Sequence, residues 1–363
     1  MDQRSIKLPG MRKEIFRMAR DEAVALLARS PVVHLATTDA TGVPVLRTVH
    51  AVVIDGALAF HGAPAGEKME AMGRPVVISA EETVAVIPSY FFDPELACPA
   101  TTYYRSVQVH GSLEIVEDRH AKARVLAALM HKYQPEGGHV PITADDPRYR
   151  KQVEGILIVR VALERLDGKG KLGQNRRPEE LARVLEQLWR RGLPGDPAAI
   201  EALRCANPST PTPAFLRAPP GARLSCALTP DDLDGALALL VDEYWNVAVP
   251  RAAIARALLH SGAWVGAHDE GGRLIATARA LGDAGKFAKL YDVAVAPDWR
   301  GRGLGRALVR LLLDHPLVRD ARTVHLRTRD AQRFYADFGF VARSPALAPS
   351  TDMELLRPTA SAA

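Results

Sequence analysis

The sequence predicts an α+β protein with two domains joined by a proline-rich linker. Residues 207–221 hold five prolines in fifteen residues, too many for a helix or a central strand. Short apolar runs separated by turn signals precede this segment, whereas a strand, a glycine-rich turn and an amphipathic helix follow it. We therefore place the first domain at residues 11–205, the linker at 206–222 and the second domain at 223–357.

The first domain has the pattern of a β-barrel with peripheral helices. Turn signals at residues 39–42 and 55–56 separate apolar runs, and such hairpin-like connections favour an antiparallel sheet. The expected strands are residues 32–37, 45–54, 57–61, 76–79, 83–87, 106–117 and 156–166. The expected helices are residues 21–29, 120–133, 179–190 and 196–203.

The composition is that of an ordinary folded protein, with 47% apolar and 25% charged residues. The formal net charge of +5 comes from arginines spread along the chain, so no basic stripe of the kind that binds nucleic acid stands out. A basic pocket for phosphorylated cofactors accounts for the excess better than a nucleic acid partner does. The spacing of the ligand-type residues predicts no metal site.

The cysteines and the apolar runs predict a cytoplasmic protein. Cys98, Cys205 and Cys226 have neither metal-binding nor CxxC spacing, so we expect reduced thiols. No stretch of about 18 uncharged apolar residues occurs, and the N-terminus has no apolar signal core. We therefore expect neither export nor insertion into a membrane.

The most informative stretch is residues 290–308, where a strand enters a glycine-rich turn that opens into an amphipathic helix. Gly301, Gly303 and Gly305 allow the backbone N–H groups to point at one spot, and the helix adds the positive end of its dipole. The turn lacks the Gly-Lys-Ser/Thr of a Walker loop and the Gly-x-Gly-x-x-Gly of a Rossmann turn. It predicts an anion site of another kind.

This stretch resembles the coenzyme A loop of the GNAT acetyltransferases, whose Arg/Gln-x-x-Gly-x-Gly/Ala signature is met by Arg300, Gly303 and Gly305. Residues 326–340 resemble the last helix and closing strand of that family, where a Tyr precedes a Gly-Phe pair. The resemblance covers residues 223–357. It implies a GNAT mixed α/β fold, acetyl-CoA as cosubstrate and a small-molecule amine as acceptor.

The same resemblance implies roles for individual residues. Tyr335 matches the family's proton donor, although its helical spacing also fits a core aromatic. Asp292 is a candidate base or partner of a cationic amine, and equally a structural partner within the sheet. Tyr244 and Trp245 either line an acceptor pocket or cover the core. The coenzyme contacts implied are the backbone near Val293 and Val295 and the loop residues Arg300, Gly301, Arg302, Gly303, Gly305 and Arg306.

Residues 42–50, 60–69 and 104–111 together resemble the FMN-binding split barrels of the pyridoxamine phosphate oxidase superfamily, most closely the branch of the nitroimidazole-resistance proteins. In that superfamily a strand arginine and basic residues near the next strand end hold the FMN phosphate, which here would be Arg47 and Lys68. The planar guanidinium of arginine suits this role. Ser106 and Gln108 depart from the oxidase pattern, so the resemblance supports the fold more than that activity. The implied FMN contacts are Arg47, His50, His61, Lys68 and Arg105.

Three readings of the whole chain remain open at this point. We expect a bifunctional protein, an N-acetyltransferase joined to an FMN-dependent, oxidoreductase-like flavoprotein domain, and a homodimer formed through the split barrel. One alternative is a regulator that senses flavin or coenzyme A without turnover. Another is a haem-binding split barrel performing oxidative nitrogen chemistry, with His34, His50, His61 and His110 as candidate ligands.

Overall fold

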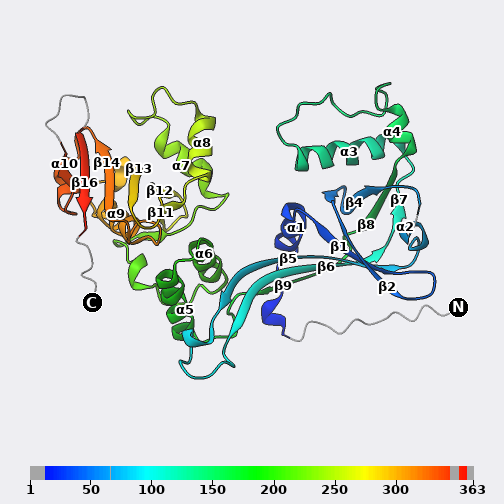
Figure 1. Ribbon diagram of the computed structural model, residues 1–363, viewed down its shortest axis with the longest axis horizontal. Helices are drawn as coiled ribbons and strands as arrows, with labels where there is room; N and C mark the ends of the chain where they lie inside the picture. The colour runs from blue at the N-terminus through cyan, green and yellow to red at the C-terminus, as the bar shows by residue number, and fades with distance from the viewer. Residues whose placement is uncertain (1–12, 66, 344–350, 358–363) are drawn as a thin grey trace. The chain divides into compact units, whose positions relative to one another are not determined.

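The computed structural model describes residues 13–65, 67–343 and 351–357, and the chain forms two compact units. The first unit comprises the chain up to Val86 together with Thr102–Gln174 (Figure 1). The second comprises Ile87–Thr101 and the chain from Asn175 onward. Residues 175–222, which the sequence analysis divided between the first domain and the linker, thus group with the second unit.

The first unit contains two antiparallel sheets. The strand order of the larger sheet is β2-β1-β5-β6-β9, and that of the smaller is β3-β4-β8-β7. These strands form two sheets and no closed barrel within the described residues, the arrangement expected of a split barrel. The elements are η1 (Glu14–Phe16), α1 (Arg20–Arg29), β1 (Val33–Thr38), β2 (Pro44–Val49), β3 (Val52–Ile54), β4 (Ala57–Gly62), α2 (Glu67–Glu70), β5 (Pro75–Ile87), β6 (Thr101–Ser112), β7 (Glu114–Ile115), α3 (Arg119–Tyr133), α4 (Arg150–Gly155), β8 (Leu157–Ala162) and β9 (Arg165–Lys171).

One hydrophobic core joins the two sheets of this unit. Ile78 and Val107 contribute from the larger sheet, Phe60 and Val159 from the smaller one, and all four are fully buried. Helix α1 packs on β9 so closely that a Cβ atom on Gly168 would lie 2.8 Å from the Cβ of Ala23. Glycine is required there by close approach of the backbone.

The second unit is built on a seven-stranded sheet with the order β10-β11-β12-β13-β14-β16-β15. Strands β13 and β14 pair in parallel, whereas the other pairings in the sheet are antiparallel. The elements are η2 (Ser89–Phe91), α5 (Pro178–Arg191), α6 (Asp196–Ala206), η3 (Ala214–Leu216), β10 (Ala222–Ser225), α7 (Asp232–Leu240), α8 (Arg251–Leu259), β11 (Ala263–Asp269), β12 (Leu274–Gly282), β13 (Phe287–Val295), η4 (Pro297–Trp299), α9 (Leu304–Asp314), β14 (Thr323–Thr328), α10 (Gln332–Ala336), β15 (Val341–Ala342) and β16 (Thr351–Leu356).

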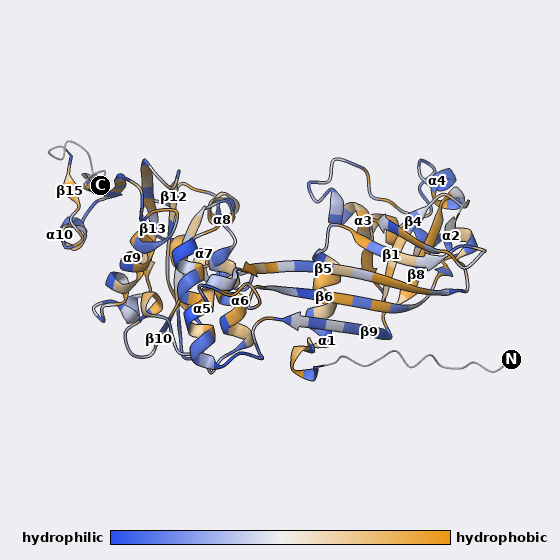
Figure 2. Cartoon of the chain, turned by 60° about the horizontal axis from the view of Figure 1, so that its bottom comes forward, coloured by the Kyte–Doolittle hydropathy of each residue, from blue (hydrophilic) through white to orange (hydrophobic). Residues whose placement is uncertain are grey.

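Helix α5 follows the local rules for helix boundaries. It begins at Pro178, whose fixed φ suits the first turn, and ends before Gly192, which has a φ of 68°. Leu181, Leu185 and Leu188 are buried, and Figure 2 shows hydrophobic and hydrophilic stretches along this one helix. The predicted helix at 179–190 is confirmed.

The predicted linker contains the short helix η3, which packs on α5. The rings of Phe215 and Trp189 stack with centroids 4.5 Å apart, and the Trp189 indole donates to Asp314 at the end of α9 over 2.6 Å. The proline-rich composition therefore gives an irregular segment that still buries an aromatic side chain.

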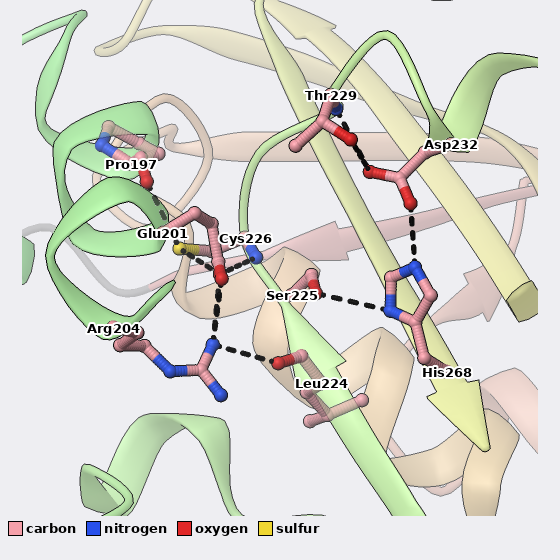
Figure 3. A network of polar contacts seen from close by, with 9 residues as sticks. All are labelled: Pro197, Glu201, Arg204, Leu224, Ser225, Cys226, Thr229, Asp232 and His268. Carbon is pink, nitrogen blue, oxygen red and sulfur yellow. Dashed lines mark hydrogen bonds and ion pairs between the residues drawn. The ribbon is translucent and has the colours of Figure 1, made fainter. Parts of the chain in front are cut away.

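Buried polar side chains fasten α6 and α7 to the sheet edge (Figure 3). Glu201 of α6 accepts from the Cys226 N–H at 2.8 Å and pairs with Arg204 at 2.9 Å. In the first turn of α7, Asp232 lies 2.6 Å from Nε2 of His268 on β11. Among the helices of the described ranges, none is both long and apolar enough to cross a bilayer.

Candidate active site

A split between β13 and β14 opens a cavity in the second unit. The two strands pair from Phe287 with Thr323 to Lys289 with His325, and the register then ends. Beyond that point a cavity of about 1100 Å³ is lined by both strands, residues 289–295 and 326–328 among them. The split gives a ligand access to backbone groups that would otherwise pair across the sheet.

A β-bulge at Asp292 shapes one wall of this cavity. In the register between β12 and β13, Ala278 faces two residues, Asp292 and Val293, and Asp292 has a φ of 55°. A bulge leaves the extra residue unpaired and re-aims neighbouring groups. Val293 and Val295, both predicted as coenzyme contacts, line the cavity.

The glycine-rich turn lines the cavity with Gly301, Gly303 and Gly305. Gly301 and Gly303 have φ values of 75° and 80°, and α9 begins directly after Gly303. A Cβ atom on Gly301 would meet nothing within 4 Å, and one on Gly303 only the Cγ of Pro219 at 4.0 Å. Glycine is therefore required by backbone conformation, and the open space before the helix N-terminus fits an approaching phosphate.

The three loop arginines differ in their surroundings. Nε of Arg300 donates to the Val295 carbonyl at 3.0 Å, and its guanidinium lies 3.6 Å from Glu243. Arg306 also lines the cavity and pairs with Asp337 at 2.7 Å. Arg302 instead stacks over the ring of Trp299, 5.0 Å from its centroid. Arg300 and Arg306 are thus the two of the three that face the cavity.

Tyr335 lies in the cavity wall with its ring packed edge-on against Phe334 and Phe340, at 5.0 and 5.9 Å. Tyr335 is only 8% exposed, as expected of a core aromatic, and it also lines the cavity, as expected of a proton donor. The two interpretations are therefore compatible. Burial, aided by the nearby Tyr244, raises the pKa of Tyr335 to about 12. The hydroxyl is consequently protonated at neutral pH and can donate a proton.

Asp292 is anchored by two long-range contacts. Its carboxylate pairs with the Arg279 guanidinium and accepts from the Trp245 indole N–H at 3.0 Å. The Asp292 and Arg279 side chains are only 7% and 11% exposed. Each carboxylate oxygen thus has a partner, which supports the structural role, and the role as a base stays a prediction.

The segment Glu243, Tyr244 and Trp245, which we name the strap, connects the two diverging strands. Trp245 contacts Asp292 on β13, and the Tyr244 hydroxyl accepts from the Arg329 N–H just after β14, at 3.1 Å. The Arg329 guanidinium lies 3.8 Å from the centroid of the Tyr244 ring. The sequence left open whether Tyr244 and Trp245 line a pocket or cover the core, and both line the cavity. It gave no local signal for Arg279, Arg329 or Glu243.

A Ser-His-Asp sequence of contacts in the same unit is not this site. Ser225 Oγ lies 3.3 Å from Nδ1 of His268, whose Nε2 contacts Asp232 (Figure 3). The three residues are 4%, 8% and 7% exposed and none lines the cavity. A nucleophilic serine must reach its substrate, so this network is structural.

The predicted flavin contacts of the first unit lie on both sheets. Arg47 is exposed on the edge strand β2, where it pairs in register with Leu35, and Arg105 lies on β6. Two strands, β1 and β5, separate β2 from β6, which corresponds to about 14 Å. Arg105 also contacts Glu82 at 3.3 Å. The phosphate clamp that the resemblance implies, Arg47 with Lys68, stays a prediction.

The remaining flavin candidates are equally dispersed. His61 is exposed at the end of β4 in the smaller sheet, and His50 is exposed after β2 with its ring 4.8 Å from that of Tyr133. Lys68 falls in α2, but its side chain lies outside the described residues.

One family model matches part of each unit of the chain. Residues 19–170 match the pyridoxamine 5′-phosphate oxidase family, and residues 260–342 match the acetyltransferase (GNAT) domain. The histone acetyltransferase TAP1 of Glycine max is 42% identical over 72 residues, which cover 19% of this chain and 31% of that protein. The chain thus spans about a third of the length of the first curated relatives it matches.

Two solved structures illustrate the likeness. A GNAT-family protein from Xanthomonas campestris pv. campestris is 34% identical, with 35% of this chain and 87% of that chain covered and a TM-score of 0.30. A protein described as a 5-nitroimidazole antibiotic resistance protein, from Bacteroides thetaiotaomicron, is 16% identical, with 42% and 85% covered and a TM-score of 0.35. By the family matches, this chain joins a pyridoxamine 5′-phosphate oxidase-like domain to a GNAT acetyltransferase domain.

Proposed function

We propose that the chain transfers the acetyl group of acetyl-CoA to the amine of a small molecule. The observation that carries this proposal is the cavity between β13 and β14, which has the N-terminus of α9 and two positive-φ glycines at one end and Tyr335 in its wall. Such an end holds phosphates through backbone N–H groups and the helix dipole. The split strand offers backbone groups to the pantetheine arm.

The bulge backbone and Tyr335 have different roles in the proposed reaction. The backbone at the Asp292–Val293 bulge supplies an N–H to the thioester carbonyl, where negative charge develops. The amine lone pair attacks that carbon, a C–N bond forms and the C–S bond breaks. The departing thiolate takes the Tyr335 proton, which a pKa of about 12 keeps in place until then. The proton released by the amine restores the tyrosine or goes to water.

Release of the coenzyme A thiol in the presence of an amine panel tests this proposal. The wild-type chain should release thiol only when an amine is present and should form an equal amount of acetylated product. Binding of acetyl-CoA without any turnover across the panel would instead favour a coenzyme A sensor.

For the first unit we propose a flavin site, FMN in the first instance, shared by two copies of the chain. The family match supports the ligand class, and the dispersal of Arg47, His61 and Arg105 over two sheets supports a site completed by a second copy. Leu46 on the edge strand β2 and Val43 just before that strand are 61% and 55% exposed, and they give that copy an apolar surface to cover. Haem is the alternative ligand, and an oxidoreductase activity depends on which group is bound.

The state of the cysteines is consistent with the cytoplasmic location expected from the sequence. All three are free thiols, and Cys98 and Cys205 are exposed. Exposed thiols persist in reducing compartments, so we propose the cytoplasm as the location.

A further inference from the structure

The Tyr291 ring contacts two basic side chains, one from its own strand and one from the neighbouring strand, beside the proposed position of acetyl transfer. The Arg279 guanidinium on β12 lies 4.8 Å from the Tyr291 ring centroid, and Nζ of Lys289 on β13 lies 5.2 Å from it. Arg279 continues to Asp292, and Asp292 to Trp245 of the strap. Lys289, Tyr291 and the strap all line the cavity that contains the bulge.

The carboxylates that line the cavity all have basic partners. Asp292 pairs with Arg279, Glu243 lies 3.6 Å from Arg300, and Asp330 lies 3.5 Å from Arg329. Their negative charge is thus balanced before any substrate enters. A cationic acceptor would find no unpaired carboxylate among these three.

Lys289 differs from these paired side chains because it has no oppositely charged partner among the described residues. It is exposed, it lines the cavity, and no carboxylate of the described residues lies within 4.0 Å of its ammonium group. Its separation from Val293 along β13 is four residues, or about 13 Å of strand at most. The flexible lysine side chain shortens this reach, so one small molecule can contact both Lys289 and the bulge.

We propose that the acetyl acceptor is an amine that also carries an anionic group, a carboxylate or a phosphate, and that Lys289 pairs with that group. This inference rests on the proposed acetyl transfer and names the substrate class for it. An ammonium group matches either anion through charge-assisted hydrogen bonds. Lys289 then selects the acceptor by contact.

The acceptor attacks as its neutral amine, because only the neutral form has a free lone pair. A neutral amine attacks the thioester without a carboxylate base. This accounts for a site in which Asp292 is fully engaged by Arg279 and Trp245.

A matched acceptor series tests the inference on the full chain. Glycine, β-alanine, γ-aminobutyrate and phosphoethanolamine are compared with glycinamide, β-alaninamide, γ-aminobutyramide and ethanolamine, at equal concentrations of neutral amine. We expect kcat/KM to favour the anionic member of at least one pair by about tenfold or more, the effect of one charge-assisted contact. Lys289→Glu should remove or invert this preference while acetyl-CoA affinity is retained.

Lys286→Glu is the control, because it makes the same charge change at an exposed residue of the neighbouring turn that does not line the cavity. It should leave the preference unchanged. Preference for the neutral members or for spermidine, or an unaltered ratio in Lys289→Glu, would overturn the inference. Acetyl-CoA binding with no acetylation of either series would also overturn it, whereas failure to bind acetyl-CoA would point to the proposed function itself.

Discussion

Tyr335 combines a place in the cavity wall with a hydroxyl that stays protonated at neutral pH. Tyr335→Phe keeps the ring packing against Phe334 and Phe340 and removes only the proton donor. Because general acid catalysis contributes about 10²- to 10⁴-fold, we expect kcat to fall by at least about a hundredfold. Acetyl-CoA affinity, measured by calorimetry on the same sample, should stay within about twofold of wild type, as expected when the lost interaction is made only in the transition state. An unchanged kcat would remove Tyr335 from the mechanism.

Substitution of Asp292 distinguishes a structural role in the sheet from a role as general base. Asp292→Asn leaves the buried Arg279 without a charged partner, so we expect a loss of about 3 kcal/mol in the free energy of unfolding. The pH–rate profile should keep its shape, since the carboxylate does not take the proton. Asp234→Asn is the matched control, because the Arg251–Asp234 pair is exposed and worth at most about 1 kcal/mol.

The opposite pattern would contradict this account of Asp292. If the acidic limb of the pH–rate profile disappeared in Asp292→Asn while stability was retained, the residue would be the general base that the resemblance suggested. Chemical denaturation and the rate profile measured on one preparation separate the two roles.

At the scale of elements, His315 at the end of α9 makes the packing around α5 sensitive to acid. Burial, together with the positive charge of Arg319, lowers the pKa of His315 to about 4. Its Nδ1 accepts from the Leu317 N–H at 3.1 Å, and its ring packs edge-on against Trp189 at 5.5 Å. The neutral imidazole is therefore part of the folded state.

The sign of the pH effect follows from this. An unfolded histidine has a pKa of about 6.5, so the unfolded chain takes up the proton first as the pH falls. We expect His315 to contribute a loss of about 3 kcal/mol in the free energy of unfolding as the pH drops from 6.5 to 4. Denaturation of wild type and His315→Gln across that window should show a smaller decrease in the variant. Parallel curves would contradict the assignment.

The elements that the sequence predicted well are those with local signals. Pro178 and Gly192 bound α5, and the glycine-rich turn fixes the start of α9. The two strands expected at 76–79 and 83–87 are one continuous strand, β5, which includes residues 80–82. The expected strand at 45–54 divides into β2 and β3, and that at 156–166 into β8 and β9.

In the candidate site, too, the sequence predicted features that depend on neighbouring residues and missed contacts between residues far apart in sequence. The coenzyme loop has a local glycine signal, whereas the role of Tyr335 was implied by the family resemblance. Both line the same cavity. The Arg279–Asp292 and Tyr244–Arg329 contacts join residues 13 and 85 positions apart, so spacing gave no sign of them. The flavin residues came from a resemblance alone, and the fold distributes them over two sheets.

For the whole molecule, the two units carry separate predictions. The visible absorption spectrum of the purified chain, taken before and after denaturation, identifies the group held by the first unit. We expect flavin bands and, by size-exclusion chromatography with light scattering, a dimer. Leu46→Glu at the exposed edge of β2 should give monomers that lose the flavin. A Soret band in the wild-type spectrum would establish haem in place of flavin. A monomer that keeps its flavin would exclude a site shared by two copies.

Calorimetric titration of acetyl-CoA into the full chain tests the central claim most directly. Wild type should bind with one site per chain, and Gly303→Val should not bind, since a branched side chain at a φ of 80° would occupy the approach to α9. Gly272→Val is the matched control, because Gly272 has a φ of 82° and lies in a turn outside the cavity. Binding lost in Gly303→Val and kept in Gly272→Val would support a coenzyme A site at this turn, whereas normal binding by Gly303→Val would contradict it.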